Sequence, residues 1–92
     1  MSKVTEAEIR ETCRYLRRPL IERRFVQFCI REGEVPPPWL QERVLDAARA
    51  QGFVNTAPGA GDGDLLWTSP SGERRRLVLT PAGEGLCDPV SP

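Results

Sequence analysis

The sequence contains no histidine, and this absence removes much of the chemistry by which small proteins act as enzymes. Histidine is the commonest metal ligand and general base, and it activates most serine and cysteine nucleophiles. We therefore expect a protein that is not an enzyme, that binds no metal and no cofactor, and that has no small-molecule substrate.

Long apolar runs and paired cysteines are absent too. The longest apolar stretch is interrupted by Gln27, and residues 1–11 lack the hydrophobic segment of a signal peptide. Cys13, Cys29 and Cys87 are widely spaced and form no C-x-x-C pair, so the sequence indicates neither a disulfide framework nor a zinc site. We expect a cytoplasmic protein without membrane contact.

The chain has 92 residues, a length that suits one domain. Hydrophobic residues make up 39% and charged residues 28%, a balance typical of a folded chain. We expect a single domain over residues 1–87 and a loose tail over residues 88–92.

The charges cancel overall, with 13 basic and 13 acidic residues, but they are unevenly distributed. Residues 1–31 carry eight bases and four acids, whereas residues 32–64 carry two bases and six acids. Nearly all the bases are arginine, which binds phosphate and carboxylate through paired hydrogen bonds. This pattern predicts a basic face and an acidic face that partners can bind, or alternatively a surface whose charges pair with one another.

Helix signals occur mainly in the first half of the chain and strand signals in the second. Thr5 and Glu8 form a capping box that begins the first helix, and Pro19 ends it because the residue before a proline disfavours the α conformation. Turn residues at 70–73 separate two apolar segments, which predicts a β-hairpin. The predicted elements are helices at 5–17, 19–33 and 38–52, a short strand at 53–54, hairpin strands at 65–69 and 74–80, and a helix at 81–87.

The helix at 19–33 has the broadest apolar face, so we expect it to be the most buried helix. Two cysteines, Cys13 and Cys29, lie on apolar helical faces and are expected to be small buried side chains. Apolar spacing in the helices and strands predicts the rest of the core. Its expected members are Phe25, Phe28, Leu40, Val44, Leu77 and Leu79.

The order of the elements predicts an α+β fold, a small winged-helix-like domain with three helices, a β-hairpin wing and a short C-terminal helix. Gly52-Phe53-Val54 and the run ERRRLVLTPAGEGL at 73–86 resemble the wing of MarR-type winged-helix transcription regulators. The resemblance covers about 35 residues. It implies that Arg74 and Arg75 contact DNA near the minor groove.

The chain differs from that family in two respects. A helix-turn-helix has a short helix before its reading helix, and here either that helix is missing between residues 32 and 38 or the 19–33 helix takes its place. The long dimerisation helices of the family are also absent. In the expected reading helix, Glu42 and Asp46 offset the two arginines.

These observations support two alternative functions. The first is a small DNA-binding regulator of transcription that contacts duplex DNA. Its expected contacts are Arg74, Arg75, Arg76, Arg43 and Arg49. The second is a protein-binding module that reuses the winged-helix shape, such as a small phage-type inhibitor, of the anti-CRISPR kind, of a host nucleic-acid machine. Its contacts with a protein or nucleoprotein partner would be Arg17, Arg18, Arg23 and Arg24.

Overall fold

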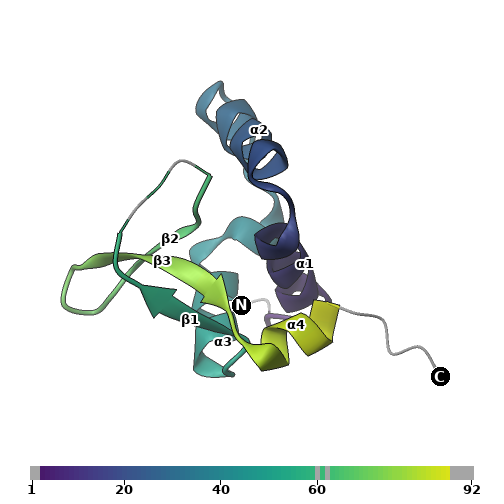
Figure 1. Ribbon diagram of the computed structural model, residues 1–92, viewed down its shortest axis with the longest axis vertical. Helices are drawn as coiled ribbons and strands as arrows, with labels where there is room; N and C mark the ends of the chain where they lie inside the picture. The colour runs from purple at the N-terminus through teal and green to yellow at the C-terminus, as the bar shows by residue number, and fades with distance from the viewer. Residues whose placement is uncertain (1–2, 60, 62, 88–92) are drawn as a thin grey trace.

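The computed structural model describes residues 3–59, 61 and 63–87. Within these residues the chain forms a small α+β domain of four α-helices and a three-stranded antiparallel sheet (Figure 1). The elements in chain order are α1 (Glu6–Arg17), α2 (Leu20–Arg31), the 3-10 helix η1 (Pro38–Leu40), α3 (Glu42–Ala50), β1 (Val54–Ala57), β2 (Leu66–Thr68), β3 (Arg74–Leu79) and α4 (Pro81–Cys87). Three α-helices and the 3-10 helix η1 precede the strands and one α-helix follows them, so the predicted order of helices and strands fits roughly. The tail expected at 88–92 lies outside the described residues.

The predicted capping box begins α1. The backbone N–H of Glu8 donates to Thr5 Oγ1 at 3.2 Å, and the backbone N–H of Thr5 donates to Glu8 Oε1 at 3.0 Å. At the other end, Arg18 has an extended backbone with φ −67° and ψ 150° because Pro19 follows it. The prediction for the first helix is confirmed.

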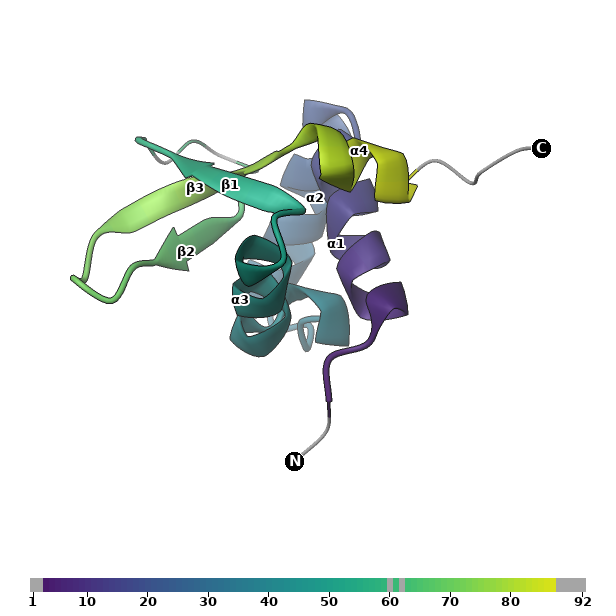
Figure 2. The same ribbon diagram turned by 90° about the horizontal axis from the view of Figure 1, so that it is seen from below.

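The core lies between α1, α3, α4 and one face of the sheet (Figure 2). Helix α1 contributes Ile9, Cys13 and Tyr15, each at most 1% exposed. Burial raises the pKa of the Cys13 thiol to about 12. The other buried apolar residues are Val44, Leu45, Ala48, Val54, Leu65, Trp67, Leu77 and Cys87.

Strand β3 is the middle of the sheet, whose order is β1-β3-β2, and it is antiparallel to both neighbours. Successive side chains of a strand point to opposite faces. Leu77 is buried against the helices, and Arg75 and Leu79 share its face. Arg74 and Arg76 therefore lie on the outer face, as alternation predicts.

The third helix begins differently from the prediction. Pro38 opens the 3-10 helix η1, and the α-helix starts only at Glu42. Trp39 of η1 packs on Tyr15 with the ring centroids 5.6 Å apart, and the Thr12 hydroxyl donates to the Trp39 carbonyl. Helix η1, rather than α2, therefore fills the space beside α1.

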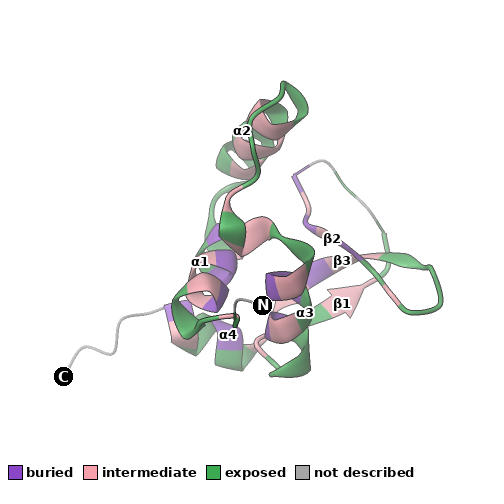
Figure 3. Ribbon diagram, turned by 180° about the vertical axis from the view of Figure 1, so that it is seen from behind, coloured by how far each residue is buried: buried purple, intermediate pink, exposed green. Residues whose placement is uncertain are grey.

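The prediction that the second helix is the most buried one is wrong. None of the residues of α2 is buried, and Figure 3 shows this helix projecting from the rest of the domain. Phe25 is 66% exposed and Phe28 is 51% exposed, so neither belongs to the core. Apolar spacing identifies one face of a helix, but it does not show which neighbour covers that face.

The rest of the predicted core is placed more accurately. Val44 and Leu77 are buried, and Leu40 and Leu79 are partly buried against the core. Of the two cysteines expected to be buried, Cys13 is buried and Cys29 on α2 is only half-buried. None of the described helices is long and apolar enough to cross a membrane.

Candidate nucleic-acid interface

The β2–β3 hairpin extends beyond the helices, as Figure 2 shows. Its turn is held by two backbone hydrogen bonds, from Ser69 N–H to the Glu73 carbonyl at 2.8 Å and from Gly72 N–H to the Ser69 carbonyl at 2.9 Å. Gly72 has a φ of 90°, a conformation that favours glycine. The turn therefore fixes the start of β3, where the three consecutive arginines lie.

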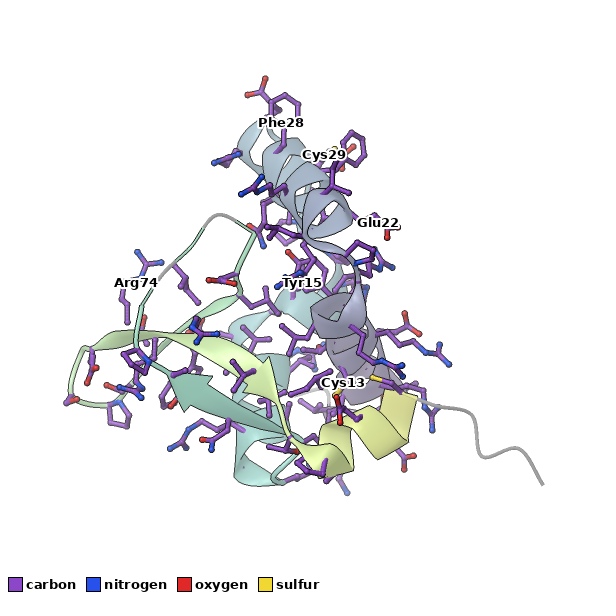
Figure 4. All side chains as sticks on the ribbon, viewed as in Figure 1. Cys13, Tyr15, Glu22, Phe28, Cys29 and Arg74 are labelled. Atoms are coloured by element: carbon purple, nitrogen blue, oxygen red, sulfur yellow. The ribbon has the colours of Figure 1, made fainter. Side chains whose placement is uncertain are left out.

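The three arginines are divided between the two faces of the sheet. Arg75 lies on the inner face, where Nε donates to Thr56 Oγ1 at 2.9 Å and Nη1 contacts Glu73 Oε1 at 2.9 Å. Arg76 lies on the outer face, and its Nε donates to the Pro58 carbonyl at 3.2 Å. Arg74 is exposed on the outer face, and its side chain has no hydrogen bond or ion pair with any other described residue (Figure 4).

Arg49 of α3 lies near the inner face of the hairpin. Its guanidinium carbon is 4.4 Å from the ring centroid of Trp67, whose Nε1 donates to Asp46 Oδ1 at 2.5 Å. Trp67 is the cross-strand partner of Arg75. Directly paired residues share a face of a sheet, so Arg49 and Arg75 approach Trp67 from α3 and from β3.

Arg43 lies away from the other four predicted DNA contacts. It is six residues before Arg49, which is about 9 Å along the helix axis and on a different side of the helix. Its Nη2 forms an ion pair with Glu8 Oε2 at 2.8 Å, and its Nε donates to Gln41 Oε1 at 3.2 Å. The Thr5 backbone N–H and, after it, Arg43 lower the pKa of Glu8 below its ordinary value. Arg43 thus joins α3 to the start of α1.

The alternative set of arginines at the junction of α1 and α2 is also divided. The Arg18 guanidinium carbon lies 5.9 Å from the centroid of Trp39. Arg17 and Arg18 line a shallow hollow beside Cys87. Arg23 instead points to the loop before β2, where Nη1 is 3.7 Å from Asp64 Oδ1.

The exposed apolar face of α2 is the surface that the sequence did not reveal. The spacing of its apolar residues predicts a buried face, whereas the structure leaves that face exposed. Three aromatic residues, Tyr15, Trp39 and Trp67, pack in or against the core and were not among its predicted members. Tyr15 and Trp39 lie outside the apolar repeats of the predicted helices, whereas Trp67 alternates with the buried Leu65 in the predicted strand at 65–69. Those three rings belong to or pack against the core, and Phe25 and Phe28 do not.

Comparison with known proteins does not extend this description. No family model matches the chain, and no curated protein or solved structure is significantly similar to it. Functional proposals therefore depend on the geometry of the chain itself.

Proposed function

We propose that this protein is a small winged-helix DNA-binding domain whose β2–β3 hairpin binds the backbone of duplex DNA. The observation that carries the proposal is a projecting hairpin with arginine on both faces next to its turn. Arg74 and Arg76 occupy the outer face and Arg75 the inner face. A narrow hairpin with this pattern can contact phosphates on both sides of a groove.

The contacts would be mainly to phosphate rather than to bases. Arg74 and Arg76 are two residues apart, which separates them by about 7 Å along the strand and lets them contact different phosphates. Arg75 already contacts a carboxylate, that of Glu73, and would exchange this exposed ion pair for a phosphate. In α3, Arg49 lies beside the acidic Asp46, so this helix offers a weak surface for reading bases.

The salt dependence of binding tests the proposal. A double variant, Arg74→Ala with Arg76→Ala, should bind a fluorescent duplex more weakly than the unmodified protein in anisotropy titrations at low salt. The slope of log affinity against log salt should fall by about 0.9 for each phosphate contact removed, or up to ~2 in total. The fold should be retained because both positions lie next to an exposed turn.

A matched double variant on α1, Arg14→Ala with Arg17→Ala, removes the same charge from another surface. It should change both the affinity and the slope much less than the hairpin variant does. The proposal is overturned if the unmodified protein has no measurable affinity for duplex DNA at ~50 mM salt, where nonspecific binding is strengthened. Equal effects of the two double variants would also contradict it, because only net charge would then matter.

A protein-binding module is the second candidate, and the exposed apolar face of α2 favours it. Under this alternative, changing Arg17, Arg18, Arg23 and Arg24 together to Glu should abolish association with the partner, because opposite charges would be replaced by like charges. The hairpin double variant should have almost no effect on that association. The DNA-binding candidate thus predicts the larger effect for changes at the hairpin, and the protein-binding candidate predicts it for changes at the junction of α1 and α2.

A further inference from the structure

Helix α2 exposes a continuous apolar stripe along one side. Ile21 is 77% exposed, Phe25 is 66% exposed and Phe28 is 51% exposed. Their spacing of four and three residues places them on one side of the helix. Figure 4 shows Phe28 and Cys29 on the part of α2 that lies farthest from the sheet. Scattered exposed apolar residues are common, but a contiguous stripe of this kind marks an interaction surface.

The opposite side of α2 is attached to the domain, so the stripe faces away from it. Arg23 forms the ion pair with Asp64, and its carbonyl accepts a hydrogen bond from the Tyr15 hydroxyl at 3.2 Å. Gln27 Nε2 donates to the same Tyr15 hydroxyl at 3.1 Å. Arg23 and Gln27 each follow a stripe residue by two positions, a rotation of about 200° around the helix.

We propose that the stripe is a homodimer interface in which two copies of the chain pair antiparallel through α2. The charges at its ends indicate this occupant. Arg18 and Glu32 are both exposed and lie just outside α2, at the beginning and the end of the stripe. Arg18 lines a shallow hollow together with Ile21 and Phe25. An antiparallel second copy places Arg18 opposite the partner's Glu32 at both ends, whereas a parallel copy places like charges together.

The two-fold axis falls at Phe25. Along α2, residues whose numbers add up to 50 then lie opposite each other, which pairs Ile21 with the partner's Cys29. Arg18 lies two residues before α2 and Glu32 one residue after it, so Arg18 of each copy comes to the same end of the pair as the partner's Glu32. The two Phe25 rings meet at the centre of the interface. Large central aromatic side chains of this kind usually contribute much of the binding free energy.

The area of the stripe suits a weak but specific dimer. Taking roughly 200 Å² for a fully exposed large side chain, the three stripe residues offer on the order of 400 Å² per copy. The stripe alone would then bury about 800 Å² in a symmetric pair, and its polar flanks bring the total above the ~1,000 Å² expected of specific interfaces. We expect a dissociation constant in the range of about 1–100 µM.

Sedimentation equilibrium of the full chain tests the dimer directly. Phe25→Glu should raise the dissociation constant by at least about tenfold, because it places two carboxylates at the centre of the interface. The control is Val35→Glu, which changes a side chain that is 87% exposed but lies beyond the helix and outside the stripe. This control should change the constant by no more than about twofold. Circular dichroism should show both variants folded, since Phe25 is not buried.

The order of charges along the stripe gives a second test. Arg18→Glu should weaken the dimer by roughly 2- to 30-fold, the range for the loss of two exposed ion pairs. Adding Glu32→Arg to the same chain restores opposite charges at both ends and should restore most of the affinity. A double variant that is weaker than Arg18→Glu alone contradicts the antiparallel pairing.

Disulfide trapping distinguishes the antiparallel from the parallel dimer. In the antiparallel pair the two Cys29 residues lie about 12 Å apart along the helix axis, too far for a disulfide. Ile21→Cys creates a thiol opposite the partner's Cys29 and should give a covalent dimer on mild oxidation. The same variant with Cys29→Ser should give none. Efficient trapping of the unmodified chain through Cys29 would instead show a parallel arrangement.

The proposal is overturned if the unmodified protein stays monomeric at ~1 mM, or if Phe25→Glu and Val35→Glu change self-association equally. In that event the stripe is not a homodimer interface, and α2 is left for a different protein partner or a membrane surface. Each of these measurements uses the protein alone. Dimerisation is therefore tested independently of DNA binding.

Discussion

Helices α1 and α2 are neighbours of equal length, 12 residues each, yet they are used in opposite ways. Both are strongly amphipathic, and both carry arginine on their polar sides. Helix α1 buries Ile9, Thr12, Cys13 and Tyr15, whereas α2 buries none of its residues. Two similar patterns in one chain thus give a core helix and a projecting helix.

The difference comes from what lies beside each helix. Helix α1 packs against α3, α4, η1 and β3. Helix α2 makes at most slight backbone contact with any other described element, including α3. It is joined to the domain by the Arg23–Asp64 ion pair with the loop before β2, by hydrogen bonds to Tyr15 and by Val26, which packs against the core. The Tyr15 hydroxyl links the two helices, since it donates to the Arg23 carbonyl and approaches the Gly63 carbonyl at 3.1 Å. An amphipathic pattern specifies a face that can be covered, and the tertiary structure decides what covers it.

Truncating one aromatic residue in each helix should give the largest difference in stability between changes in α1 and changes in α2. Tyr15→Ala removes a ring with no exposed surface and should lower the free energy of unfolding by ~3–5 kcal/mol. Phe28→Ala removes a half-exposed ring and should lower it by under ~1 kcal/mol. Urea denaturation of the monomer at low protein concentration measures both. Equal losses would show that α2 is packed in the domain after all.

Two glycines of α4 test how tightly this helix packs in the domain, where it contacts α1. A Cβ at Gly83 would lie 2.0 Å from the Phe53 carbonyl oxygen and 2.8 Å from Leu79 Cδ2. Gly83→Ala must therefore shift α4 and should destabilise the protein by about 1–3 kcal/mol. Gly85 has nothing within 4 Å, so Gly85→Ala is the matched control and should be neutral or stabilising by up to ~1 kcal/mol. Thermal denaturation compares them, and a destabilising Gly85→Ala would contradict this account.

Local signals in the sequence predicted the elements well. The capping box, the proline at 19 and the turn at 70–73 each act through neighbouring residues, and each lies where the structure confirms it. The prediction that Phe25 and Phe28 belong to the core failed for a different physical reason. Burial of a helix face depends on residues far away in the chain, such as Trp39, whose ring packs on Tyr15 of α1.

The positions of the candidate site residues were predicted only where they depend on neighbouring residues in the chain. Strand alternation correctly separated Arg75 from Arg74 and Arg76, because the two-residue period of a strand is a local property. The sequence could not show that Arg43 pairs with Glu8 on another helix or that Arg49 stacks on Trp67. Both contacts join segments that are distant in the sequence.

The smallest expected effect concerns how the two helices begin. Glu8 completes the capping box of α1, whereas the N-cap of α2, Pro19, forms no side-chain capping hydrogen bond. The Thr5 N–H and then Arg43 lower the pKa of Glu8 from its ordinary value of 4.5, so its carboxylate stabilises the folded state above that pH. This contribution should be lost as the pH falls from about 4.5 through the lowered pKa in the folded protein.

Melting temperatures measured between about pH 7 and pH 3 should show this effect as a difference between variants. At neutral pH the melting temperature of Glu8→Gln should lie below that of the unmodified protein. The two melting temperatures should converge in acid because glutamine resembles the protonated carboxyl. Glu22→Gln removes the same charge from the first turn of α2, where no capping box forms. The difference in melting temperature between this variant and the unmodified protein should stay nearly constant across the pH range. If the difference for Glu8→Gln also stayed constant, the carboxylate of Glu8 would not stabilise α1, and the two helix starts would be equivalent in solution.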